Sequence, residues 1–220
     1  GSYEWAEKRL GVDVARFGDD RTVLFPRQGL AAFEPVIMRH TRGSAVSVDI
    51  AQRAMGMMNE MQAKHNPLDA ELFGGSEVQV FLDDTVGWAH GAVDVLRASG
   101  RPAYAVQFDK PSANPRYKNM RAQIWMEGAD WIKRGGCLPR IPEMIAELTS
   151  TTYFFSGGKF QIEAKDQVKK RLGRSPDLAD AFNVTFALPD TPARVRTGFE
   201  HKRNSSLNDY DPYAGMNEIG

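Results

Sequence analysis

Five aspartates lie in three short stretches of the chain and could together hold a metal ion. They are Asp13 in GVDVARFGDDRTV, Asp83 and Asp84 in VQVFLDDTVG, and Asp177 and Asp180 in RSPDLADAFNVTFA. Each has apolar neighbours, and removing the water from an unpaired carboxylate is costly. Every buried aspartate therefore needs either a partner in the fold or a bound cation.

The spacing of these aspartates predicts where they point. In an extended strand Asp13 faces away from Val12 and Val14. Asp83 ends a strand, and the carboxyl ends of strands in open sheets are where ligands usually bind. Asp177 and Asp180 are three residues apart, so they share one face of a helix that Ser175 would cap. One sheet and one packing helix would bring all three stretches together.

Each stretch also has a purely structural interpretation. Asp13 could pair with Arg16 or Arg21 beside a turn. Asp83 and Asp84 could end a strand and begin a turn, where aspartate is common. Asp177 could serve only the helix dipole, because acids in a first turn are stabilising.

A cluster of carboxylates repels itself unless a cation neutralises it. Oxygen ligands suit Mg²⁺ or Mn²⁺, and the lone Cys137 excludes disulfides and a cysteine-based zinc site. The four histidines, His40, His65, His90 and His201, have no metal-ligand spacing. Two metals ~4 Å apart, bridged by one aspartate, would activate a water and stabilise the leaving 3′ oxygen of a phosphodiester.

The hydrophobic pattern predicts the elements that position these residues. Strands are expected at Leu10–Ala15, Arg21–Pro26, Phe33–His40, Val78–Asp83 and Ala103–Phe108, with a turn at Phe17–Asp20. Helices are expected at Ser44–Lys64, with Ser44 or Ser47 as cap, and at Gly87–Ser99, Tyr117–Arg134, Pro142–Leu148, Asp166–Leu172 and Ser175–Ala187. A hairpin, Thr151–Phe155 and Phe160–Ala164, surrounds the turn Ser156–Lys159. Met120, Ile124, Trp125 and Ile132 form the buried side of the long helix.

The order of these elements predicts the fold class. Three sequential strands linked by short turns are antiparallel, whereas strands that follow helices add in parallel. This is the order of the ribonuclease H-like fold, a mixed central sheet flanked by helices. We divide the chain into a tag or linker remnant at 1–8, a nuclease domain at 9–188 and a polar, flexible tail at 189–220.

Composition limits the possible partners. The 220 residues carry a formal net charge of +0, and no run of 18 apolar residues predicts a membrane span. Between Arg101 and Arg174 there are 14 Lys and Arg against 7 Asp and Glu. The basic stretch just before Asp177 predicts phosphate contacts by Lys165, Lys169, Lys170, Arg171 and Arg174. Val168 and Leu172 would anchor this segment to the core.

The three acidic motifs, above all KKRLGRSPDLADAFNVTFA, resemble the nuclease domain of the large terminase subunit of tailed bacteriophages. The resemblance runs from about Gly11 to Ala187. It implies an endonuclease that uses Mg²⁺ or Mn²⁺ to cut concatemeric viral DNA during packaging. Asp13, Asp83 and Asp180 match the metal-binding triad, and Asp177 matches a supporting position. The glycines after the middle motif are spaced differently from those of the family, so Asp84 stays an alternative to Asp83.

The resemblance also implies partners and a location. These are double-stranded DNA, the terminase small subunit, the portal protein and an ATPase domain of the same polypeptide, in the cytoplasm of the infected bacterium. No Gly-x-x-x-x-Gly-Lys-Ser/Thr loop occurs, so the chain is expected to be a fragment without the motor, and a monomer in isolation.

Three other functions remain open. A junction resolvase of the same fold uses similar acids but would normally be a dimer that prefers branched DNA. An actin-like or sugar-kinase-like protein begins with a similar hairpin but needs two such domains. A non-catalytic DNA-docking module would keep the fold without cutting.

Overall fold

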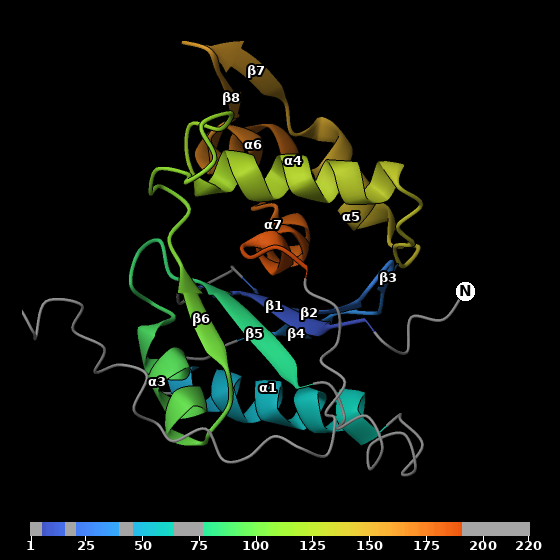
Figure 1. The fold of residues 1–220 in the computed structure, drawn as a ribbon, viewed down its shortest axis with the longest axis vertical. Helices are drawn as coiled ribbons and strands as arrows, with labels where there is room; N and C mark the ends of the chain where they lie inside the picture. The colour runs from blue at the N-terminus through green and yellow to red at the C-terminus, as the bar shows by residue number, and fades with distance from the viewer. Residues whose placement is uncertain (1–5, 16–20, 40–45, 64–76, 191–220) are drawn as a thin grey trace, which may run out of the picture.

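A computed structural model describes residues 6–15, 21–39, 46–63 and 77–190. Its centre is a mixed sheet with helices on both faces (Figure 1). The strands of this sheet are β1 (Lys8–Asp13), β2 (Thr22–Gln28), β3 (Ala31–Ala32), β4 (Val36–Met38), β5 (Val78–Asp83) and β6 (Ala103–Val106). A separate two-stranded hairpin consists of β7 (Tyr153–Ser156) and β8 (Lys159–Ile162).

The strand pairing has the predicted mixture of directions. The order is β3-β2-β1-β5-β6, with β4 also paired to β2. β2 is antiparallel to β1, β3 and β4, whereas β5 is parallel to β1 and to β6. This topology confirms the predicted ribonuclease H-like class.

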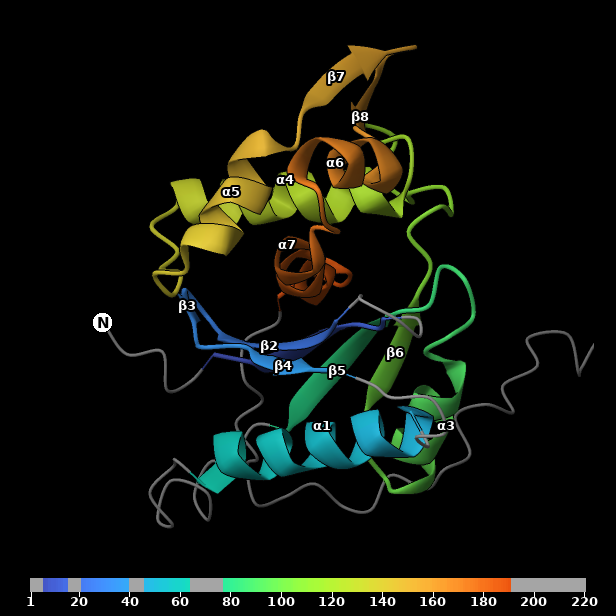
Figure 2. The same cartoon turned by 180° about the vertical axis from the view of Figure 1, so that it is seen from behind.

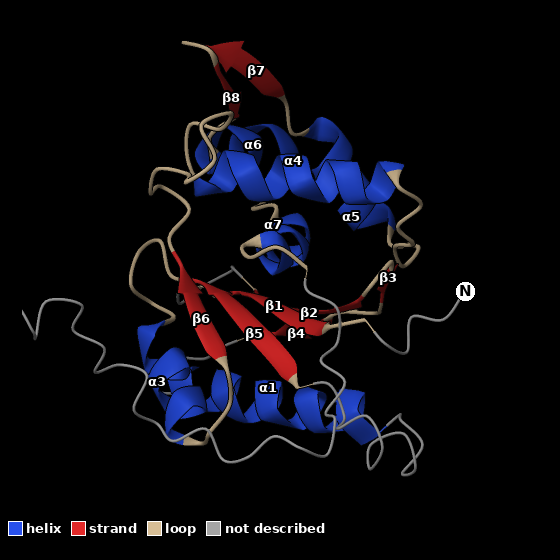
Figure 3. Cartoon of the chain, viewed as in Figure 1, coloured by secondary structure: helices blue, strands red, loops and turns tan. Residues whose placement is uncertain are grey.

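The helices form layers on the two faces of the sheet. α1 (Val46–Ala63) and α3 (His90–Ala98) cover one face. α7 (Asp177–Asn183), continued by the 3₁₀ turn η1 (Val184–Phe186), covers the other (Figure 2). Beyond α7 lie α4 (Met120–Lys133), α5 (Pro142–Ser150) and α6 (Lys165–Leu172), so this side has two helical layers (Figure 3).

Strand alternation divides the core between these layers. Leu10, Val12 and Val14 pack with the α1 side, together with its buried methionines Met57 and Met58. Gly11 faces α7, and a Cβ there would lie 1.9 Å from the carbonyl oxygen of Ala181. Only glycine lets α7 approach β1 this closely.

Several predicted boundaries were wrong for identifiable reasons. Only Val36–Met38 (β4) of the expected strand Phe33–His40 is a strand, and Pro35, which has no N–H for the ladder, lies directly before it. Ser47 lies inside α1, and Pro176 rather than Ser175 precedes the first residue of α7.

The long helix starts three residues later than predicted, at Met120. The side chain of Asn119 caps it by accepting a hydrogen bond from the N–H of Ala122. Trp131 is buried there, whereas Ile132, which was predicted to be buried, is 37% exposed.

Some predictions lie outside the described residues. These are the turn Phe17–Asp20, the cap Ser44, the histidines His40, His65 and His201, and the tail beyond Asp190. At the two predicted domain boundaries, Lys8 is already part of β1, and Pro189 and Asp190 contact buried arginines. Among the described residues no helix is long and apolar enough to cross a membrane.

Candidate active site

Two strand ends and one helix bring four of the predicted aspartates together. Val12 of β1 pairs with Leu82 of β5, so Asp13 and Asp83 are the next residues on adjacent parallel strands. Alternation turns both toward α7, which carries Asp177 and Asp180. Asp180 is fully buried, Asp13 and Asp177 are 3% and 6% exposed, and Asp83 is half-buried.

The partner of Asp13 within the fold is Lys165, the first residue of α6. The Nζ atom of Lys165 donates to both carboxylate oxygens of Asp13, at 3.2 and 3.0 Å. The same nitrogen lies 3.0 Å from Oδ2 of Asp180. One ammonium therefore lies between two carboxylates from opposite ends of the chain. The alternative partner Arg21 instead forms an ion pair with Glu143.

The other oxygen of Asp180 is held by α4. The indole Nε1 of Trp125 donates to Oδ1 of Asp180 at 2.9 Å, and Nη2 of Arg121 lies 3.6 Å from the same oxygen. On β5, Oδ1 of Asp83 accepts from the N–H and the hydroxyl of Thr85, at 3.0 and 2.5 Å. These contacts fix both carboxylates before any ligand arrives.

One lysine does not neutralise four carboxylates. Burial raises the pKa of Asp13 well above its ordinary value; Lys165 opposes the rise, and the neighbouring acids add to it. Burial likewise raises the pKa of Asp83 and of Asp177. Asp180 is the exception, because Lys165 and Arg121 outweigh burial and lower its pKa.

The pKa of Lys165 responds in the opposite direction. Burial alone would lower it, but Asp13, Asp180 and Asp83 raise it well above its ordinary value. The site therefore favours a cation among these acids.

Asp84 points to a different set of contacts. Its Oδ1 accepts from the N–H of Ala89, just before α3, and its Oδ2 lies 3.4 Å from Nδ1 of His90. His90 itself is largely exposed. These contacts favour Asp83 over Asp84 as the β5 member of the acidic cluster.

Behind Asp177 lies a second group of charges that was not predicted. Arg21 and Arg174 both bind Glu143, at 2.5 and 2.8 Å, and Nε of Arg21 lies 3.8 Å from Asp177. Glu147 of α5 is fully buried, and its Oε2 accepts from the N–H of Ala179 at 2.9 Å. Burial raises the pKa of Glu147 to about 7. Glu147 lies three residues after the buried Met144 on α5, and this helical spacing is the sequence signal for the burial of Glu147.

The five predicted DNA-binding residues separate into two groups. Three of them form ion pairs within the protein. Lys165 pairs with Asp13, Arg171 with Glu163 at 2.5 Å, and Arg174 with Glu143. Lys169 and Lys170 lie on the exposed side of α6. Val168 is fully buried and Leu172 half-buried, which confirms the predicted anchoring of this helix.

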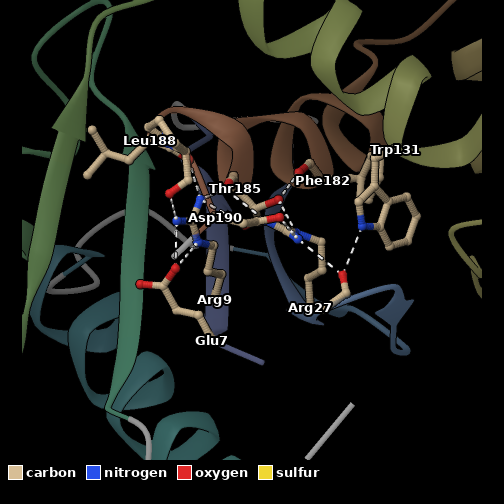
Figure 4. Close-up of polar contacts among 10 residues, drawn as sticks. Glu7, Arg9, Arg27, Trp131, Phe182, Thr185, Leu188 and Asp190 are labelled. Atoms are coloured by element: carbon tan, nitrogen blue, oxygen red, sulfur yellow. Dashed lines mark hydrogen bonds and ion pairs between the residues drawn. The ribbon is translucent and has the colours of Figure 1, made fainter. Parts of the chain in front are cut away.

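The opposite end of the same sheet face carries two buried arginines, Arg9 of β1 and Arg27 of β2 (Figure 4). Arg9 donates to the carbonyl oxygens of Thr185, Leu188 and Pro189 at 2.5–2.7 Å.

Arg27 binds both the chain end and η1. It donates to both carboxylate oxygens of Asp190, at 3.0 and 2.7 Å, and to the hydroxyl of Thr185 at 3.0 Å. Its guanidinium carbon lies 4.3 Å from the ring centroid of Phe186. We call Arg9 and Arg27 with these partners the arginine clamp.

The acidic cluster suits a hard divalent cation by its chemistry, because every donor is a carboxylate oxygen. In the described residues no three Asp, Glu, His or Cys side chains are arranged to hold a metal as they stand. The position between Asp13 and Asp180 is taken by the ammonium of Lys165. A metal ion shared by these acids would have to displace that ammonium.

Comparisons with known proteins agree with the fold. The sequence matches no protein-family model and no curated protein. The nuclease domain of the large terminase subunit gp2 of bacterial virus Sf6 is similar, with a TM-score of 0.58 and 18% identity over 83% of this chain and 89% of that one. A variant of that domain, solved with manganese, gives 0.60 and 18% over 84% and 90%.

A second virus supplies a similar structure. The large terminase nuclease from thermophilic phage G20c has a TM-score of 0.52 and 16% identity over 83% of this chain and 82% of that one. At these identities the likeness concerns the fold. The chain therefore has the ribonuclease H-like fold of the nuclease domains of phage large terminase subunits.

Proposed function

We propose that this protein is a metal-dependent DNA endonuclease that cuts concatemeric viral DNA during genome packaging. The observation that carries the proposal is the convergence of Asp13, Asp83 and Asp180 at the carboxyl ends of β1 and β5 and on α7. The fold shared with phage terminase nucleases supports the same function.

Asp13, Asp83 and Asp180 would hold Mg²⁺ or Mn²⁺, two ions in all, with Asp177 in support. Such ions supply an activated water and stabilise the leaving 3′ oxygen of a phosphodiester. Trp125 and Thr85 orient Asp180 and Asp83 for this task. Lys165 keeps the acids together until its ammonium is displaced.

The DNA backbone would lie along the exposed side of α6. Lys169, Lys170 and Arg171 are exposed there, and Arg171 and Arg174 bind Glu163 and Glu143. Phosphate contacts position DNA without reading its sequence. We therefore assign Lys170 to the phosphate surface and Arg171 to holding α6 in place.

The wider setting follows from the same likeness. The substrate would be double-stranded DNA, and the partners an ATPase domain of the same polypeptide, the terminase small subunit and the portal protein. The reaction would take place in the cytoplasm of the infected bacterium. The isolated domain would be a monomer.

Plasmid cleavage tests the proposal. Wild type should nick supercoiled DNA in Mn²⁺, more slowly in Mg²⁺, and not at all in chelator. Asp13→Asn should lower the rate by about a thousandfold or more, because it removes a charged ligand of the metal ion that would stabilise the transition state. Asp130→Asn, an exposed aspartate on α4, is the matched control and should cut like wild type. Cutting in excess chelator, or equal rates for wild type and Asp13→Asn, would contradict the proposal.

A further inference from the structure

The β7–β8 hairpin presents an unusual row of exposed aromatic residues. Tyr153, Phe154 and Phe155 are consecutive in β7 and are 63%, 49% and 63% exposed. The hairpin projects beyond α4 and α6, away from the central sheet (Figure 1). A contiguous exposed apolar patch on a soluble protein usually marks a binding site.

Ring contacts gather these aromatics on one face of the hairpin. The centroids of Tyr153 and Phe155 lie 6.2 and 5.3 Å from the centroid of Phe160 in β8. Phe160 in turn lies 6.3 Å from Tyr117. Phe154 points to the opposite face, because neighbouring residues of a strand alternate. We call Tyr153, Phe155 and Phe160 the aromatic face.

Backbone hydrogen bonds fix β8 to the body of the protein. The N–H of Phe160 donates to the carbonyl of Arg116, and the N–H of Lys118 donates to the carbonyl of Phe160, at 2.8 and 3.0 Å. Thr152, just before β7, binds Glu163 just after β8. The aromatic face is therefore presented by a supported strand pair.

Basic residues surround the aromatic face. Lys159, Arg116 and Lys118 are exposed at the hairpin turn and beside Tyr117. The segments 110–118 and 151–162 contain no aspartate or glutamate. The acids that flank these two segments in sequence are Asp109, which is exposed, and Glu163, which is paired with Arg171. Rings flanked by cations are complementary to a polyanion whose bases offer flat apolar faces.

The geometry points to the aromatic face as a binding site for unpaired bases of a DNA strand. This inference rests on the proposed nuclease function, since cutting duplex DNA creates strand ends whose bases can separate. Bases within an intact duplex already stack on one another, so the rings can stack only on unpaired bases. Two residues separate the end of β8 from Lys165, whose ammonium contacts Asp13 and Asp180. The hairpin would thus hold a loosened strand beyond α6, on the segment that leads directly to the lysine of the acidic cluster.

Binding of a fluorescently labelled oligothymidylate in calcium tests this inference. The double variant Tyr153→Ala with Phe155→Ala should weaken binding at least about fivefold, because a base–aromatic stack contributes a factor of this order or more. Binding of blunt duplex should change less than twofold. Phe154→Ala, which removes a ring that is 49% exposed on the opposite face, is the matched control and should bind like wild type. Tyr153→Phe with Phe155→Tyr keeps both rings and should also bind like wild type.

Several results would overturn the inference. These are equal oligothymidylate affinities for wild type and the double alanine variant, an equal loss in Phe154→Ala, and no binding by wild type. A change of sedimentation in the double variant at unchanged DNA affinity would instead assign the aromatic face to contacts between copies of this chain. Equal melting temperatures show that each variant is folded.

The same variants separate this inference from the proposed function. Both alanine variants should still nick plasmid in Mn²⁺ through the intact acidic cluster. Loss of oligothymidylate binding with nicking retained supports the aromatic face. Absence of nicking by wild type contradicts the nuclease proposal but leaves the binding comparison valid.

Discussion

The acidic cluster and the arginine clamp lie at opposite ends of the same face of β1, beneath α7 and η1. At the clamp, the guanidinium groups of Arg9 and Arg27 are matched by carbonyls, a hydroxyl and Asp190. Burial would raise the pKa of Asp190, but Arg27 lowers it below its ordinary value. At the cluster, the pKa values of Asp13, Asp83 and Asp177 are all raised. Two arginines face two carboxylates, Glu7 and Asp190, at the clamp, whereas at the cluster the carboxylates outnumber the one lysine among them.

This difference separates a structural role from a functional one. Buried charges that contribute to folding are paired and hydrogen-bonded. Buried acids that remain under-compensated cost stability and are retained for what they bind. Substitutions at the two ends should therefore change stability in opposite directions.

The largest effect on stability is expected at the clamp. Arg27→Met keeps the apolar stem but removes the bonds to Thr185 and Asp190, so it should lower the free energy of unfolding by about 2–4 kcal/mol. Urea unfolding measures this. Arg140→Met, at an exposed arginine, is the control and should change it by less than about 0.5 kcal/mol. A loss no greater in Arg27→Met than in the control would mean that the clamp contributes nothing.

A smaller effect, dependent on pH, is expected at Glu147 beside the cluster. Its pKa is raised from 4.5 to about 7, so between these values the folded state binds a proton that the unfolded state releases. The free energy of unfolding should therefore fall as the pH rises through this window, by up to about 1.4 kcal/mol per pH unit. Glu147→Gln should remove this contribution. Between pH 4.5 and about 7, the free energy of unfolding of this variant should change by roughly 2–3 kcal/mol less than that of wild type.

The measurement for Glu147 is a series of urea unfolding curves from pH 4.5 to pH 8. Glu60→Gln, an exposed glutamate of α1, is the control and should follow wild type. Parallel curves for wild type and Glu147→Gln would show that Glu147 is ionised at neutral pH and that the arginines nearby compensate it.

The smallest effect on stability is expected at Asp13. Without metal, Asp13→Asn should leave the free energy of unfolding at neutral pH unchanged or raise it by about 1 kcal/mol, because ionised Asp13 is destabilising above its ordinary pKa of 3.8. The gain should disappear as the pH falls toward that value. A loss of more than about 2 kcal/mol would make Asp13–Lys165 a structural ion pair.

The sequence was sufficient to predict that the four aspartates of the acidic cluster lie close together, because their positions depend on the repeat of a strand and of a helix. Alternation fixed the faces of Asp13 and Asp83, and the three-residue step fixed Asp177 and Asp180. The clamp escaped prediction because it depends on contacts between β1 and η1, residues more than 170 positions apart. Arg9 does share the strand face of Gly11 and Asp13, and this was an available signal for its burial.

Lys165 is a second residue whose contacts the sequence did not predict. Its sequence neighbours, Lys169 and Lys170, suggested a common basic surface for DNA. Only the tertiary fold, which places the first residue of α6 beside β1 and α7, turns Lys165 inward, to Asp13 and Asp180. Pattern alone identifies charged residues but does not distinguish those that meet a partner inside the fold.

Manganese in crystals of the domain tests the central claim most directly. The account predicts an anomalous peak among the carboxylates of Asp13, Asp83 and Asp180, with Nζ of Lys165 moved away from Asp13. A matched Asp13→Asn crystal should show a weaker peak or none. If saturating manganese gives no peak while Lys165 still lies 3.0 Å from Asp13 and Asp180, the acids are a structural ion-pair network. That result would contradict the functional interpretation of this end of the sheet.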